Sequence, residues 1–168
     1  MNMEQIIDAV HALPGSLVLA PGPGSEFPEV AWGDSFFYYA PDGRVPTNTQ
    51  PYATIVTKDY PDDSASHLDQ AGRWRLNVHV GRSRFTELTG ETPGDLTRDR
   101  DFSAPDVVLP HPVYSSLGWI AIVNPADATG ALALDLVRAA HEAAAARRRR
   151  RRRRLTTPGP HRSRTGTG

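Results

Sequence analysis

The stretch RWRLNVHV, residues 73–80, decides the fold of this chain because its polar and apolar side chains alternate without a break. Successive side chains of a β-strand point to opposite faces of the sheet, so this pattern predicts a strand with one buried face. The buried face takes Trp74, Leu76, Val78 and Val80. The opposite face, which we expect to meet solvent or line a site, takes Arg73, Arg75, Asn77 and His79.

Elements on both sides of this strand complete a fold prediction. The sequence pattern predicts four further strands, at residues 17–19, 35–39, 50–59 and 117–123. It also predicts three helices, at residues 3–12, 83–88 and 126–146. Because strands follow one another between terminal helices, we expect a single α+β domain whose mostly antiparallel sheet of about five strands is flanked by N-terminal and C-terminal helices.

The charge distribution divides the chain into two parts. Residues 1–146 hold all 19 acidic residues and 9 of the 19 basic ones, whereas residues 147–168 hold ten arginines and no acid. The net charge of zero therefore combines a domain of charge −10 with a tail of charge +10. We accordingly expect one folded domain at residues 1–146 and a disordered Arg-rich tail at residues 147–168.

The tail contains a polyarginine run of eight residues, at positions 147–154. Like charges four residues apart repel on a helix, so we expect the last helix to fray within this run. One interpretation is nucleic-acid binding through the release of counterions. The other is a low-complexity extension without a role, which the absence of aromatic residues from the tail and the acidity of the domain both favour.

Several classes of site are excluded by composition and motif. The chain has no cysteine, which excludes disulfides and thiolate metal sites. The glycines at positions 22 and 24 lack the third glycine of a dinucleotide-binding loop, and neither a nucleophile elbow nor a zinc-protease helix motif occurs. We expect no cofactor. Without a secretory signal or a long apolar run, we expect a cytoplasmic protein that does not enter a membrane.

The candidate functional residues lie on the polar face of the alternating strand and beside it. We select Lys58, Arg75, Asn77, His79 and His111. Together they offer cations, an amide and two imidazoles, which suit a small anionic or carbonyl-bearing ligand. Two histidines can also ligate a metal, but no spacing identifies them as ligands, so we expect no metal site. The structural alternative is an ordinary solvated sheet face.

The sequence therefore leads to three alternative predictions of function. The first is a non-catalytic domain that binds a small ligand or a protein partner. The second is an enzyme of hydrolase or isomerase type with His79 and His111 as acid/base groups. The third is nucleic-acid binding through the tail.

We expect several further tryptophan, aspartate and histidine side chains to be structural or solvent-exposed. We expect Trp74 and Trp119 to anchor the core. We expect Asp62 and Asp63 to lie in a solvated loop, since paired carboxylates need burial to act as an acid/base pair. Three further side chains are expected at the surface: His11, His67 and His141.

Four segments, taken in order, resemble the actinobacterial proteins of the domain of unknown function 6194 family. These segments are WGDSFFYY at residues 32–39, YATIVTKDY at 52–60, RLNVHVG at 75–81, and HPVY with LGW within 111–119. The resemblance covers roughly residues 1–145. It implies no activity and no catalytic residue, because the family has none established. The arginine tail departs from the usual pattern of the family.

A second, looser resemblance concerns the order of the elements. An N-terminal helix, an antiparallel sheet and a Gly118-Trp119 strand that leads into a final helix are similar to the small MmcQ/YjbR-like domains. Those domains resemble double-wing DNA-binding folds. An analogy of fold does not transfer function, so this resemblance implies an architecture alone.

Overall fold

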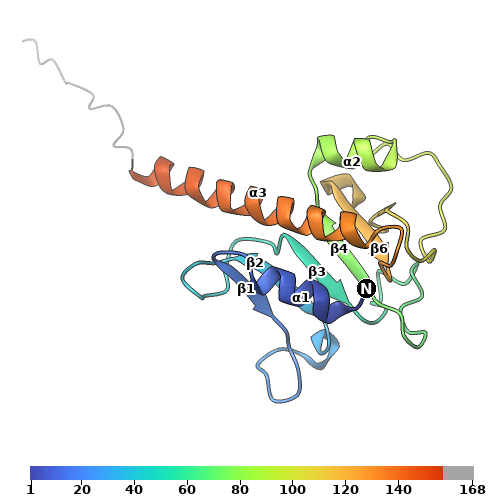
Figure 1. Ribbon diagram of the computed structural model, residues 1–168, viewed down its shortest axis with the longest axis horizontal. Helices are drawn as coiled ribbons and strands as arrows, with labels where there is room; N and C mark the ends of the chain where they lie inside the picture. Colours follow the sequence, from blue (N-terminus) through green and yellow to red (C-terminus); the bar gives the residue numbers. More distant parts are fainter. Residues whose placement is uncertain (157–168) are drawn as a thin grey trace, which may run out of the picture.

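The computed structural model describes residues 1–156 and shows a single α+β domain built on one open sheet (Figure 1). The strands are β1 (Ser16–Leu19), β2 (Ser35–Tyr39), β3 (Ala53–Val56), β4 (Arg75–His79), β5 (Leu109–Pro110) and β6 (Trp119–Val123). They lie in the order β1-β2-β3-β4-β6-β5, and each neighbouring pair is antiparallel. The predicted class is confirmed. The sheet has six strands rather than about five. The additional strand, β5, forms within residues 91–112, where the sequence shows no strand periodicity.

The helices are α1 (Met3–His11), α2 (Arg82–Thr89) and α3 (Gly130–Thr156), with short 3₁₀ turns η1 (Glu29–Ala31) and η2 (Ser115–Leu117). Asn2 caps α1 in a reciprocal capping box with Gln5, which satisfies backbone donors of the first turn. α2 begins after Gly81 rather than at Ser83, and Gly90 ends it in the left-handed conformation.

β4 lies in the interior of the sheet, with its apolar face at the centre of the core. Leu76 stands opposite Ile55 on one side and Ile122 on the other, and all three are fully buried. Val78 faces Ile120 in the same layer. The alternation in residues 73–80 therefore places the core correctly.

α1 and α3 cover this apolar face and leave the opposite face of the sheet to loops (Figure 1). α1 contributes Ile6 and Val10, and α3 contributes Ala133, Leu136 and Val137. Because both helices pack on one side, the polar side chains of β4 are covered by connecting segments.

His141 of α3 lies in this core, which corrects its predicted surface position. Its side chain is buried, and its Nε2 donates to the carbonyl oxygen of Pro14 at 3.0 Å. The rings of Tyr39 and Tyr52 each contact the imidazole edge-on, with 5.4 Å between the ring centroids. Sequence analysis missed this burial because helical periodicity does not distinguish an apolar stripe from an aromatic cluster beside it.

α3 continues through the arginine run to Thr156, which corrects the expected fraying after Ala146. Arg148 pairs with Asp42 at 2.7 Å, and Arg151 donates to Thr49 at 3.3 Å. These contacts with the loop before β3 fix one side of the run. The remainder of the predicted disordered tail, residues 157–168, lies outside the described residues. Within residues 1–156, no helix is long and apolar enough to span a bilayer.

The start of α3 is fixed by Asp106, a residue from the long connection before β5. Its carboxylate accepts the backbone N–H groups of Ala126, Ala128 and Thr129 at 2.8–2.9 Å, together with the Thr129 hydroxyl. A helix leaves its first N–H groups unpaired, so a carboxylate there stabilises it twice, through hydrogen bonds and through the helix dipole. The helix therefore begins at Gly130 and not at Ala126.

We expect Asp106→Ala to lower the melting temperature at pH 7. Hydrogen bonds from Thr129, Ala128 and Ala126 lower the pKa of Asp106 to about 2. A folded-state pKa below the unfolded value of about 3.9 gives stability that is present above pH ~4 and lost as the pH falls towards 2. Melting curves from pH 2 to 7 should show the two proteins converging at low pH. The exposed Asp99→Ala serves as the control, and a gap that does not narrow as the pH falls from 7 to 2 would contradict this assignment.

Candidate ligand-binding site

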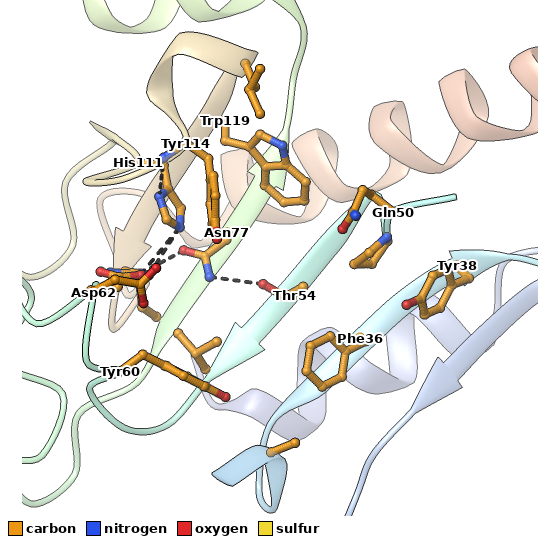
Figure 2. A pocket seen from close by; sticks show the side chains of 16 residues that line it. Phe36, Tyr38, Gln50, Thr54, Tyr60, Asp62, Asn77, His111, Tyr114 and Trp119 are labelled. Atoms are coloured by element: carbon orange, nitrogen blue, oxygen red, sulfur yellow. Dashed lines mark hydrogen bonds and ion pairs between the residues drawn. The ribbon is translucent and has the colours of Figure 1, made fainter. Parts of the chain in front are cut away.

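A cavity of about 570 Å³ opens on the sheet face that α1 and α3 leave uncovered (Figure 2). Its floor comes from alternate residues of β3 and β4: Thr54, Val56, Arg75 and Asn77. Its walls carry five aromatic side chains: Phe36, Tyr38, Tyr60, Tyr114 and Trp119. The lining is completed by Ala31, Gln50, Pro51, Asp62, Asp63, His111 and Leu117. Figure 2 shows Asn77 between His111 and Thr54.

Arg75 forms the charged part of the floor and is 1% exposed. Its Nη1 donates to Asp63 Oδ1 and to Ser66 Oγ, each at 2.9 Å, while its Nη2 donates to Asp63 Oδ2. Its Nε donates to Asn77 Oδ1 at 2.7 Å. The guanidinium is thus held in a bidentate pair and fixed in direction by the two neighbouring side chains.

Asp63 is the anion of this pair, which corrects its predicted place in a solvated loop. Burial raises the pKa of Asp63, but the hydrogen bonds and positive charge of Arg75 outweigh burial and bring that pKa below its usual value. The pair is therefore charged at neutral pH. Asp62 does lie in the exposed loop, at the edge of the cavity.

His111 lies next to this pair and is 3% exposed. Its Nδ1 accepts the backbone N–H groups of Val113 and Tyr114, each at 3.0 Å, and its ring lies 4.9 Å from that of Tyr114. Burial, and then the positive charge of Arg75, lower the pKa of His111 to about 3. The imidazole is therefore neutral at physiological pH.

Lys58 is held beside the cavity and not within its lining. Its Nζ lies 2.6 Å from the Trp32 carbonyl oxygen and 3.2 Å from Asp34 Oδ1. The buried Asp34 also accepts hydrogen bonds from Thr57 and from the Tyr60 hydroxyl. Lys58 thus belongs to a cluster that fixes the Tyr60 wall, and sequence reasoning missed Asp34 as its centre.

His79 is also outside the lining of the cavity. It pairs with Trp119 across β4 and β6, and its Nε2 donates to the carbonyl oxygen of Leu117 at 3.0 Å. On the opposite edge of β6, the backbone N–H of His111 donates to the carbonyl oxygen of Trp119. Position 119 on β6 therefore lies between His79 on β4 and the segment of His111 that follows β5. Trp119 is half-buried in the cavity wall, which corrects its predicted place as a core anchor, whereas Trp74 lies in the core as predicted.

The structure therefore brings three of the five predicted residues together, namely Arg75, Asn77 and His111. Sequence reasoning missed the aromatic wall, although the run at residues 35–39 carried a signal: one of its faces is core and the other, with Phe36 and Tyr38, lines the cavity. Within residues 1–156, no group of three potential metal-ligating side chains gathers.

Most residues that line this cavity lie in the segments on which the family resemblance depends. The family of unknown function DUF6194 matches residues 1–153. The chain belongs to this family. The DUF6194 match covers every strand and also includes most of the arginine run. No curated protein and no solved structure matches the chain. The likeness to MmcQ/YjbR-like domains stays a prediction.

We expect Asp63→Ala to destabilise the domain by about 3–5 kcal/mol, because it leaves the Arg75 charge buried without a partner. Asp62→Ala is the matched control, since it removes the adjacent carboxylate from an exposed position and should change stability by less than about 0.5 kcal/mol. Urea unfolding of both variants measures the difference. Equal stability for the two would show that the ion pair is not required for folding.

Proposed function

We propose that this domain binds a small organic ligand in the aromatic-walled cavity and catalyses no reaction on it. The observation that carries the proposal is a cavity of about 570 Å³ that combines aromatic walls with a few convergent polar groups. Ligand sites generally have volumes of roughly 300–1,000 Å³ and this mixture of lining residues.

The composition of the cavity also supports a ligand of mixed character. A flat apolar part would pack against the aromatic side chains of the lining. A polar part would meet the end formed by Arg75, Asn77 and His111. These groups are buried and fixed by their own hydrogen bonds, so they can orient a ligand at little entropic cost.

The state of the two histidines supports binding over acid/base catalysis. A general acid or base works best with a pKa near the working pH. The pKa of His111 is lowered to about 3, and burial also lowers the pKa of His79. Moreover, His111 lines the cavity whereas His79 does not, so the cavity does not bring the two histidines together.

Val56→Phe should abolish ligand binding by filling the cavity floor. Toluene and benzamide serve as probes of the cavity. A ligand at 100 times its Kd stabilises the folded state by about 2.7 kcal/mol. For a domain of this size, that corresponds to a rise of about 5–10 °C in melting temperature. We expect at least one probe to raise the melting temperature of the wild type but not that of Val56→Phe.

Val107→Phe is the matched control, because Val107 is 44% exposed and lies outside the cavity lining. Ala31→Phe blocks the cavity from its wall, in case Val56→Phe is poorly folded. If neither probe produces a shift that the blocking variants remove, the proposed function is wrong.

The second candidate function is nucleic-acid binding by the arginine part of α3. The observation that favours it is the helical form of the run, which projects beyond the sheet (Figure 1). Arg148 and Arg151 contact the loop before β3, but Arg149, Arg150 and Arg152 are exposed. A row of exposed guanidinium groups on a rigid helix can contact successive phosphates.

This candidate predicts a salt dependence that the arginines control. For duplex DNA, the log–log slope of affinity against salt concentration should become shallower in the triple variant R149Q/R150Q/R152Q, by about 0.9 for each lost phosphate contact. Fluorescence anisotropy across a salt series measures both slopes. Identical slopes for the wild type and the variant would exclude these arginines as a phosphate-binding surface.

A further inference from the structure

We propose that the ligand presents an uncharged carbonyl-type oxygen to two buried donors, Arg75 Nη2 and His111 Nε2. This inference rests on the proposed function and adds the chemical class of the ligand. It follows from the hydrogen-bond directions at the polar end of the cavity.

The first step concerns the proton on His111. Two backbone N–H groups, from Val113 and Tyr114, point at Nδ1 at 3.0 Å. Nδ1 must therefore accept and cannot carry a hydrogen. A neutral imidazole has one N–H group, so the proton resides on Nε2. Nε2 is thus a fixed donor, and the main chain sets its state.

The second step concerns the neighbours of this donor. Arg75 Nη2 lies 3.2 Å from His111 Nε2, but a guanidinium nitrogen has no acceptor capacity. Asp63 Oδ2 lies 3.8 Å away, which is beyond hydrogen-bond distance. Two N–H groups therefore face each other, and His111 Nε2 has no acceptor among these neighbours.

The third step accounts for the five N–H groups of Arg75. Four of them donate within the floor: one to Asn77, one to Ser66 and two to Asp63. The fifth, on Nη2, is directed towards His111. A single oxygen on the cavity side of this pair, about 2.9 Å from both Nη2 and Nε2, would accept from both and would offset the unfavourable approach of two buried donors.

Other polar atoms of the floor extend this donor character. Asn77 Nδ2 donates to Thr54 Oγ1 at 3.0 Å, so the Thr54 hydroxyl proton is free to point elsewhere. Asn77 Nδ2 also has a second hydrogen. Both groups line the cavity beside Arg75. The polar end is therefore built to meet an acceptor on the ligand.

Charge balance decides between a neutral acceptor and an anion. The positive charge of Arg75 is already matched by Asp63 in a bidentate pair, and His111 is neutral. Asp62 adds a further carboxylate at the cavity edge. A ligand carboxylate would leave an excess negative charge in a largely buried place, which is unfavourable. A ketone, amide or lactam oxygen accepts both hydrogen bonds without that penalty.

Three probes of similar shape test this inference by isothermal titration calorimetry on the full chain. Benzamide offers a neutral carbonyl, benzoate an anion, and toluene no acceptor. We expect benzamide to bind about tenfold more tightly than toluene, as one or two hydrogen bonds allow, and more tightly than benzoate at pH 7.

The variant His111→Asn removes the donor but keeps the fold. The Asn Oδ1 is as many bonds from the backbone as His Nδ1, so it can still accept from Val113 and Tyr114. We expect the preference for benzamide over toluene, measured as the ratio of the two affinities, to fall several-fold. His79→Gln is the matched control, since Gln keeps a donor for Leu117 outside the cavity, and its preference should equal that of the wild type.

The outcomes separate this inference from the proposed function. Equal binding of all three probes, or tighter binding of benzoate, overturns the inference and leaves the cavity as a ligand site. An unchanged preference in His111→Asn also overturns it. Loss of binding for every probe removes the proposed function itself. The ranking of the probes on the wild type stands as a test even where a variant is poorly folded.

Discussion

The ion pair between Arg75 and Asp63 is the constraint on which the rest of this structure depends. A guanidinium that is 1% exposed in an interior strand is strongly destabilising unless it is paired and fully hydrogen-bonded. Asp63 supplies the charge from the loop after β3, and Ser66 in the same loop accepts a further hydrogen bond. One buried cation therefore holds this loop over the polar face of the sheet and closes one side of the cavity.

The pair also determines the chemistry that the cavity can offer. Because Asp63 neutralises Arg75, we expect the polar end to favour an uncharged hydrogen-bond acceptor over an anion. The same guanidinium contributes to keeping His111 uncharged, so that imidazole acts as a donor of fixed direction and not as a titrating group. A separate cluster around Asp34 fixes the Tyr60 wall. The result is a site with aromatic sides and a donor-rich end, which is the mixed lining typical of small-molecule sites.

α3 shows how tertiary contacts can reverse a local expectation. Repulsion between neighbouring arginines disfavours a helix when the segment is considered alone. In the domain, the first part of the run lies against the loop before β3. There Arg148 forms an ion pair with Asp42, and Arg151 donates a hydrogen bond to Thr49. These contacts offset part of the repulsion, and the helix continues. The same principle applies at its start, where Asp106 determines the first turn from a distant part of the chain.

The sequence alone determined the class of fold and the two faces of β4, because alternation along a strand is a local property that needs no partner. It also identified Arg75, Asn77 and His111, since polar residues on a strand face and beside it stand out against an apolar core. Only the tertiary structure decided that Lys58 and His79 lie outside the cavity lining, that Asp63 is partly buried against Arg75, and that aromatic side chains from four segments enclose one cavity. Those facts depend on which distant segments meet, and pairing between distant segments leaves no periodic trace in either of them.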